Sequence, residues 1–233
     1  MKGGEVIETI AKFFNDLIGA WIPGTVMAAG FVTMHFGFDQ LLEVSKAIEG
    51  VGASLAVAGL LFGLGHLLQS VNEVLLQPVL GRISWLKKAH EQRAMRQESF
   101  KWFSGLVKEM QASPGGSEWQ FNDLRNVAFS ISVEAAEVSR RFMFISLLCN
   151  GMGTALAIMG FDLLACELFS PGLLHSYGKA APWVVQFALL VGFALALFRQ
   201  GLVFYERAML TTFSIAVAEL KFKKDVHGSG AIG

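Results

Sequence analysis

The residues best suited to chemistry stand near the end of one long apolar stretch. They are His66, Gln69, Asn72 and Glu73, separated by three, three and one positions. On a helix this spacing places the side chains along one face. Such a face can form a structural polar cluster, line a pore or meet a partner.

Recognisable catalytic motifs are missing from the chain. It has no H-E-x-x-H, no C-x-x-C pair, no phosphate-binding loop and no G-x-S-x-G. We therefore expect a protein that is not an enzyme, with no catalytic residue, no cofactor and no metal site. His35 is interpreted as an interfacial histidine, because no metal-binding motif of Cys, Asp and His surrounds it in the sequence.

The cysteines also suggest no chemistry. Cys149 and Cys166 are 17 positions apart. On one continuous helix that spacing is about 25 Å, which is beyond the reach of a disulfide. We interpret both as small apolar residues of a membrane segment, with a reactive or paired thiol as the alternative.

The elements that position these residues follow from an apolar composition. Hydrophobic residues make up 53% of the 233 residues and charged ones only 16%, whereas about 25% of a typical globular domain is charged. Lipid is then the expected solvent of the long apolar runs. The formal net charge is zero, which by itself argues neither for nor against nucleic acid as a partner. We expect none, because the basic residues of 82–110 are interleaved with acidic ones and no nucleic-acid-binding motif accompanies them.

The predicted fold is all-α: a polytopic membrane protein with four transmembrane helices and a cytosolic helical hairpin between helices 2 and 3. The expected spans are 17–38, 51–71, 142–161 and a run that starts at Trp183, each close to the roughly 20 residues that cross a bilayer. The expected domains are an N-terminal amphipathic segment (1–16), helices 1 and 2 (17–76), the hairpin (77–141), helices 3 and 4 (142–204), and a cytosolic helical extension with its tail (205–233).

The hairpin is predicted from a change in composition. Residues 82–110 mix basic side chains with an apolar stripe, which indicates a helix packed on a neighbour or lying on the membrane surface. Residues 112–117, ASPGGS, are the expected turn. Spacings of four and three through Leu124, Ile131 and Val138 then predict a coiled-coil-like seam for a partner or a second copy, unbroken into the third span.

Small residues recur along two expected spans. Gly59 and Gly63 form a G-x-x-x-G pair, and Ala188, Gly192 and Ala196 form a similar ladder. Small side chains let helix backbones approach closely. We expect these residues to pack helices together, some of them against a second copy in a homo-oligomer.

The orientation follows from the basic residues. The two expected outer loops, 39–50 and 162–181, hold one each, Lys46 and Lys179, while the other seventeen of the nineteen lie elsewhere. The positive-inside rule therefore predicts a multi-pass protein with both termini and the hairpin in the cytoplasm.

Arginines are expected at the same cytoplasmic end as the polar face. Arg199 lies near the end of the fourth span, and Arg140 at the start of the third. Ionisable groups in membrane segments are costly unless they are paired or reach water. We expect Glu73 to pair with Arg199 or Arg140; the alternative is a polar vestibule that gates a pore.

The stretch GHLLQSVNEVLL, with WIPG opening the first span, resembles uncharacterised bacterial four-helix inner-membrane proteins. The layout of four spans and a cytosolic hairpin is also similar to membrane subunits of bacterial anti-phage defence systems such as Kiwa. This resemblance implies a membrane sensor or effector and carries over no residue roles.

These patterns lead to one principal function and two alternatives. The first is a non-enzymatic, homo-oligomeric subunit that couples a cytosolic helical extension to a membrane bundle, with the bilayer and a cytosolic protein as partners, in anti-phage defence. The second is an ion channel or small transporter that uses the face from His66 to Glu73. A lipid-acting enzyme would need a nucleophile and a base, which the sequence does not show.

Overall fold

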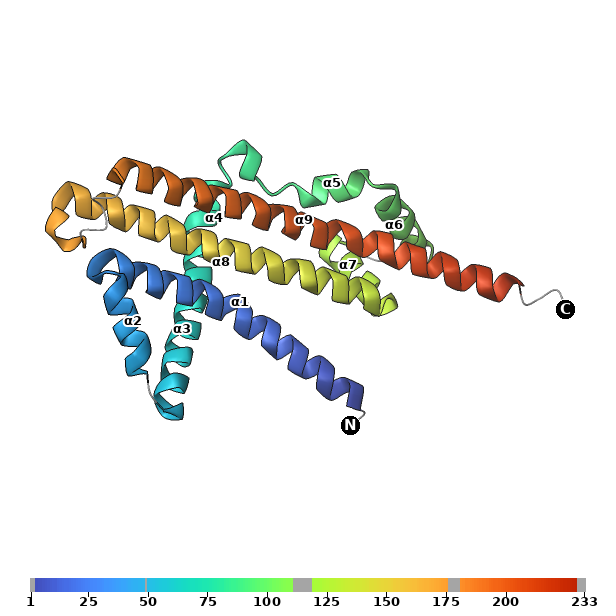
Figure 1. Ribbon diagram of the computed structural model, residues 1–233. Helices are drawn as coiled ribbons and strands as arrows, with labels where there is room; N and C mark the ends of the chain where they lie inside the picture. The colour runs from blue at the N-terminus through green and yellow to red at the C-terminus, as the bar shows by residue number, and fades with distance from the viewer. Residues whose placement is uncertain (1–2, 49, 111–118, 176–180, 230–233) are drawn as a thin grey trace. The chain divides into compact units, whose positions relative to one another are not determined.

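The computed structural model describes residues 3–48, 50–110, 119–175 and 181–229, and the side-chain surroundings within 18–48, 50–109, 119–175 and 181–222. Over these residues the chain is helical and holds no strand, as predicted (Figure 1). It divides into two compact units. The first comprises Met1–Lys87 and Phe144–Gly201, and the second Lys88–Met143 and Leu202–Gly233.

The first unit contains four long helices or parts of them, joined by short elements. Its elements are α1 (Gly3–Phe36), α2 (Phe38–Ala47), α3 (Val51–Val71), a π-helical turn (Asn72–Leu76), α4 (Gln77–Leu80), a 3₁₀ turn (Ser84–Leu86), most of α8 (Val133–Phe169), a second 3₁₀ turn (Pro171–Leu173) and the beginning of α9 (Trp183–Ser229).

The expected outer loops are more helical than predicted. The segment 39–50 is largely α2, and α8 continues to Phe169 instead of ending at 161. The first expected span also stops short of residue 38, because Gly37 separates α1 from α2 with φ at 91°. That backbone conformation favours glycine, which has no Cβ to clash.

α1 and α8 run in the same direction within the first unit and touch at glycines. Gly19 lies against Phe144 near one end of the contact, and Gly30 lies against Met159 further along. The contacts advance in the same order on both helices, so the helices are parallel. The missing Cβ atoms let the helices approach closely.

α9 returns antiparallel to α8. Gly153 lies against Phe198, and Gly160, further along α8, lies against the earlier residue Val191. The Ser146 hydroxyl donates a hydrogen bond of 2.8 Å to the Gly201 carbonyl on α9. Small residues and a hydroxyl thus join the two longest helices, as expected when lipid supplies no hydrophobic drive for association.

α3 runs across α1 at another glycine contact (Figure 1). A Cβ added to Gly24 would overlap the Leu61 carbonyl, and one added to Gly65 would overlap the Ala20 carbonyl. The two backbones therefore meet directly. Most other residues of α3 are exposed, and only Gly65 and Leu68 are buried.

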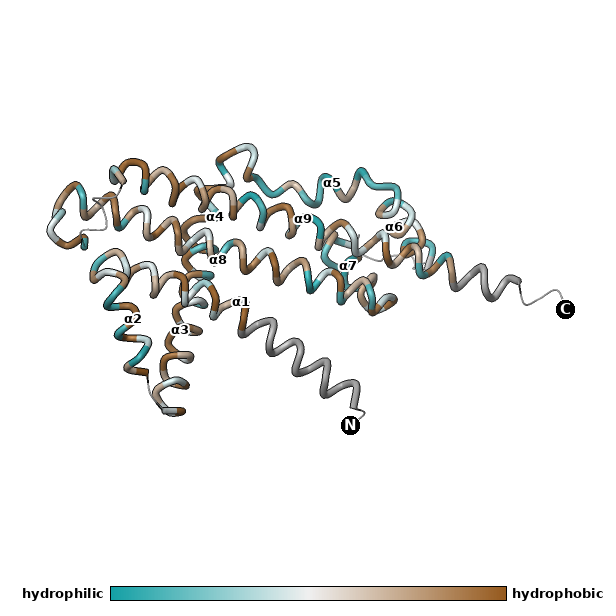
Figure 2. Tube along the Cα trace, in the orientation of Figure 1, coloured by the Kyte–Doolittle hydropathy of each residue, from teal (hydrophilic) through white to brown (hydrophobic). Residues whose placement is uncertain are grey.

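Three helices of the described chain are long and apolar enough to cross a membrane. They are Val51–Leu80, Val133–Phe169 and Trp183–Phe222. Figure 2 shows apolar residues along α3 and along the first-unit parts of α8 and α9, whereas hydrophilic and apolar residues alternate along α2. These helices indicate a membrane protein. The described part of α1 is not among the three.

The second unit is an all-helical body with its own core. It contains α5 (His90–Arg96), α6 (Glu98–Met110), α7 (Phe121–Ile131), the start of α8 and the end of α9. Phe103 and Phe213 are fully buried. The rings of Phe100 and Phe121 pack against the ring of Phe213, with ring centroids 4.9 and 5.5 Å apart, respectively. Burying large aromatic side chains is the main stabilising contribution to such a core.

The predicted unbroken seam from the hairpin into the third span is wrong in one respect. α7 ends at Ile131, and α8 begins at Val133. Between them Ser132 has extended backbone angles, and its hydroxyl accepts a hydrogen bond of 3.1 Å from the Ala135 amide. Ser132 therefore caps a new helix. The expected turn at 112–117 lies outside the described residues.

Candidate functional site

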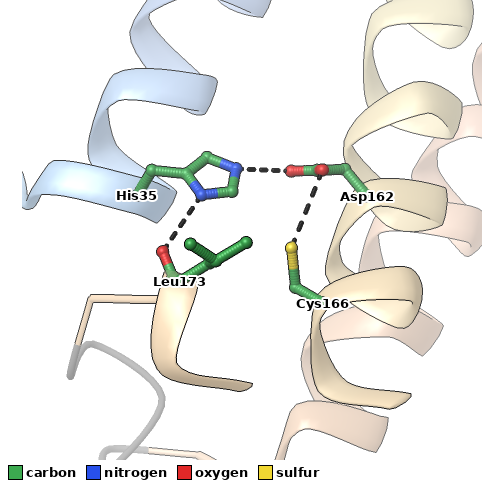
Figure 3. A network of polar contacts seen from close by, with 4 residues as sticks. All are labelled: His35, Asp162, Cys166 and Leu173. Carbon is green, nitrogen blue, oxygen red and sulfur yellow. Dashed lines mark hydrogen bonds and ion pairs between the residues drawn. The ribbon is translucent and has the colours of Figure 1, made fainter. Parts of the chain in front are cut away.

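The densest group of ligand-type side chains lies where the end of α1 meets the end of α8 (Figure 3). His35 Nε2 is 2.7 Å from Asp162 Oδ2, and His35 Nδ1 is 3.1 Å from the Leu173 carbonyl oxygen. Leu173 belongs to the 3₁₀ turn that follows α8. One imidazole thus joins three segments of the first unit.

Cys166 completes the group. It lies four residues after Asp162 on α8, and its sulfur is 3.9 Å from Asp162 Oδ1. The ligand atoms of His35, Asp162 and Cys166 all lie within 4.8 Å of one another. Cys166 is buried, while the side chains of His35 and Asp162 are 12% and 29% exposed. The carboxylate can therefore be reached from solvent while the thiol is enclosed.

Backbone contacts hold the histidine in place. The His175 amide donates a hydrogen bond of 3.0 Å to the Met34 carbonyl, so the turn after α8 is tied to the last turn of α1. Gly37 leaves room for the His175 ring, since a Cβ there would lie 2.7 Å from its Nε2. The helix break at Gly37 and the turn at Leu173 position His35 together.

The hydrogen bonds determine where protons lie on His35. A carbonyl oxygen only accepts, so Nδ1 must carry a proton toward Leu173. Nε2 faces a carboxylate oxygen at 2.7 Å, and two lone pairs cannot meet at that distance without a cation between them. Either a proton or a metal ion must lie there. Nε2 is therefore not available to activate the Cys166 thiol as in a cysteine–histidine nucleophile.

The polar residues predicted on one face of α3 and the following turn divide between two faces. Gln69 donates to the Gly19 carbonyl at 3.3 Å, and buried Asn72 donates to the Thr154 hydroxyl at 3.0 Å. His66 and Glu73 are instead exposed. The inward pair joins α3 and the π-helical turn to α1 and α8, and the outward pair is open to the surroundings.

The expected ion pairs of Glu73 do not form among the described residues of the first unit. Arg199 instead donates a hydrogen bond of 2.8 Å to the Trp85 carbonyl, in the 3₁₀ turn after α4. Arg140 belongs to the second unit, where it donates to the Ala136 carbonyl at 3.3 Å. The backbone carbonyl at Trp85 was not foreseen, because a sequence does not reveal which carbonyls a turn exposes.

The predicted small-residue ladders face outward in this chain. Gly59, Gly63 and Gly192 have no atom near the position of an added Cβ, and Ala188 and Ala196 are also exposed. The close helix contacts use other glycines. On α3 the exposed small residues share their face with His66 and Glu73.

The seam predicted for a partner is partly occupied by the chain itself. Leu124 is buried in the second unit, and Ile131 packs at the edge of the same core. Val138 is half-buried on α8. The apolar pattern of α7 thus serves α6 and α9 of its own unit.

The second unit encloses a charged contact that sequence reasoning missed. Glu206 on α9 is ion-paired with Arg93 on α5, and the two side chains are 7% and 53% exposed. On the same unit Arg125 donates to the Ser139 hydroxyl at 2.9 Å, which donates to the Ala208 carbonyl at 3.0 Å. Glu206 itself was the signal in the sequence, because it is an acidic residue on an otherwise apolar face of the last helix.

His90 lies beside this contact. Its ring packs edge-on against Phe121 and Tyr205. Burial lowers the pKa of His90, and Lys88 and Arg125 add to this lowering, while Glu91 and Glu206 oppose it. The enclosed imidazole therefore resists protonation in the folded unit.

Comparison with known proteins assigns no family to this chain. No protein-family model matches the chain, and no curated protein or solved structure is similar to it.

The cluster at His35 was missed because its members are far apart in the chain. His35 and Asp162 are separated by 127 positions. Only the pairing of Asp162 with Cys166, four residues apart on one helix, was visible as a local signal.

Proposed function

We propose that this chain is a non-enzymatic, four-span subunit of a bacterial inner membrane that couples a cytosolic helical unit to a membrane bundle. The observation that supports this most is that α8 and α9 each contribute to both units. They contain 37 and 47 residues, whereas about 20 cross a bilayer. The remainder of α9 supplies Met209, Phe213 and Ala216 to the core of the second unit.

The helix directions support four crossings. α1 and α8 are parallel by their contacts, and α9 is antiparallel to α8. A chain that crosses four times with both termini in the cytoplasm requires these relations between its first, third and fourth spans. α1 would then be the first span, in addition to the three long apolar helices, with its C-terminal end and the His35 cluster on the periplasmic side.

Coupling follows from the continuity of the helices. α9 passes from the first unit to the second without a break after Gly201, and the Ser139–Ala208 hydrogen bond joins α8 to α9 within the second unit. We expect a partner that binds the second unit to act on the membrane parts of α8 and α9, because both helices continue from one unit into the other. No catalytic group is needed for such a function.

A partner test uses the core of the second unit. We expect tagged full-length chain, extracted with native lipid, to carry a soluble protein that is lost from the Phe213→Ala variant, because this substitution removes the ring at the centre of the core. Ser214→Ala on the exposed face of α9 is the control. A chain that purifies alone, or that retains the same companion in both variants, contradicts the proposal.

Homo-oligomerisation is the second part of the proposal. Gly59, Gly63, His66 and Glu73 form one exposed face of an apolar helix. In lipid an exposed carboxylate without a partner is costly, and exposed glycines permit close backbone approach. A second copy packed on this face would give the Glu73 carboxylate a partner and would place its backbone close to the two glycines.

Disulfide cross-linking tests this face. In a chain with both native cysteines replaced by serine, we expect Gly63→Cys to cross-link copies in native membranes. Leu60→Cys, exposed on the flank of the same helix, is expected to cross-link much less. Equal cross-linking at both positions, or none at Gly63, argues against an interface on this face.

An ion channel or small transporter is the second candidate. Glu73 lies in the π-helical turn Asn72–Leu76, and such turns occur often at functional sites. If copies surround an aqueous path, Glu73→Gln will change ion flux in liposomes without changing assembly. Unchanged flux in an assembled variant excludes this role for Glu73.

The setting in anti-phage defence rests on the layout alone. It predicts that cells carrying the chain and its neighbouring genes form fewer plaques than cells carrying the Phe213→Ala variant. Equal plaque numbers would remove the defence setting and leave the membrane-subunit proposal intact.

A further inference from the structure

We propose that His35, Asp162 and Cys166 form a binding site for Zn²⁺ that closes the end of α1 onto the end of α8. This inference does not rest on the function proposed above. It rests on the donor atoms, their distances and the hydrogen bond that orients the histidine (Figure 3).

The donor set matches the preference of zinc. Zn²⁺ binds imidazole nitrogen, carboxylate oxygen and thiolate sulfur, with bond lengths of about 2.0–2.3 Å. These bond lengths place the ligand atoms of a tetrahedral site about 3.3–3.8 Å apart. Here the His35 nitrogen is 2.7 Å from Asp162 Oδ2, and the Cys166 sulfur is 3.9 Å from Oδ1, the other oxygen of the same carboxylate. Small side-chain rotations would admit the ion. Harder cations such as Mg²⁺ and Ca²⁺ prefer oxygen ligands, so the sulfur and nitrogen select against them.

The histidine is already oriented as a zinc ligand requires. A metal-bound imidazole usually donates its other N–H to a carbonyl or a carboxylate, which determines the tautomer and the ring direction. The bond of 3.1 Å from His35 Nδ1 to the Leu173 carbonyl provides this contact and leaves Nε2 facing Asp162.

Burial distinguishes the cluster from a chance surface group. Cys166 is 7% exposed and the His35 side chain 12%, so both are held in place. The Asp162 side chain, 29% exposed, leaves a route for the ion. Three protein ligands leave a fourth position, which we assign to water, as in zinc sites that are open to solvent.

Binding displaces protons in a defined way. The zinc ion replaces the proton between His35 and Asp162, and the Cys166 thiol loses its proton as the zinc–sulfur bond forms. No oxidation or reduction is involved. The ion joins α1, α8 and, through the carbonyl of Leu173, the turn after α8.

Cobalt provides the most specific probe. Full-length protein in detergent, stripped with chelator, is titrated with Co²⁺ and then Zn²⁺. We expect one ion per chain and a thiolate-to-cobalt charge-transfer absorption that zinc abolishes. The spectrum of the unmodified protein needs no variant, so failure of a variant to fold does not affect the test. Absence of the thiolate band in the unmodified protein overturns the proposal.

Matched variants identify the ligands. Cys166→Ser should lose the band and at least about tenfold in Zn²⁺ affinity, measured by competition with a chromophoric chelator. Cys149→Ser, on the same helix, and His66→Gln, on exposed α3, should retain both. Equal zinc affinity in Cys166→Ser and in the unmodified protein would mean that the ion binds elsewhere, and the proposal would be wrong.

Discussion

At the scale of single residues, Glu206 is the group whose partner matters most to the second unit. Its side chain is almost fully buried, it pairs with Arg93, and its other carboxylate oxygen has no hydrogen-bond partner among the described residues. A buried charge left without its partner is strongly destabilising. The half-exposed position of Arg93 reduces the effect, because water can replace part of the interaction.

We expect Arg93→Ala to lower the free energy of unfolding by about 1–3 kcal/mol. The measurement is thermal or chaotrope unfolding of the full chain in detergent. Lys101→Ala, which removes the exposed pair of Lys101 with Glu98, is the control and should change stability by less than about 1 kcal/mol. If the two substitutions lowered the free energy of unfolding equally, the Arg93–Glu206 pair would stabilise the fold no more than an exposed ion pair does.

His90 predicts a dependence of stability on pH. Its pKa is lowered from 6.5 in the folded chain, mainly by burial, so between the two pKa values the unfolded state binds the proton and the folded state does not. The free energy of unfolding therefore keeps the whole contribution of neutral His90 above about pH 6.5, and it falls as the pH drops toward the pKa of His90 in the folded chain. His90→Phe, which retains the ring packing, should reduce this acid loss in melting curves recorded from neutral to mildly acidic pH. If the melting temperatures of His90→Phe and of the unmodified chain fell equally with pH, His90 would not be the source of the acid loss.

At the scale of elements, glycines decide which helices touch. Gly59 and Gly63, which were expected to pack against another helix of this chain or against a second copy, are exposed in the single chain. The contact between α1 and α3 uses Gly24 and Gly65 instead. A spacing of four marks a face of small residues; it does not identify the partner helix, which depends on how the whole chain packs.

Gly65→Ala tests this contact. The new methyl group would overlap the backbone carbonyl of Ala20, which cannot rotate away, so we expect a loss of about 1–3 kcal/mol or more. Within a single chain Gly63→Ala has open space, so in copies separated by detergent it should be neutral or stabilising by up to about 1 kcal/mol, because alanine is the better helix former. Unfolding in detergent distinguishes them. A Gly65→Ala variant as stable as Gly63→Ala would show that the helices do not cross here.

The elements themselves were more predictable than their ends. Apolar periodicity and length correctly indicate an all-helical chain, and α9 begins at Trp183, where the fourth run was expected. Gly37 and Ser132 were missed as helix boundaries, because single residues that break a helix leave little trace in an apolar pattern. The His35 site was unpredictable for a different reason: it joins residues distant in sequence, and only folding brings them together.

At the scale of the whole molecule, the proposed function requires α8 to cross a membrane, so that residues near its two ends are reached from opposite sides. Exposed serines mark the two sides: Ser130 on α7 of the second unit and Ser170 just after α8 in the first. Each can be replaced by cysteine in a chain whose native cysteines are serine. A substitution at an exposed position should leave the fold unchanged.

Labelling of these two cysteines with a membrane-impermeant maleimide is the most direct test. In intact cells with a permeable outer membrane, we expect Ser170→Cys to react, and Ser130→Cys to react only after the inner membrane is opened. Labelling of both from the same side, or of Ser130→Cys alone in intact cells, would contradict the account.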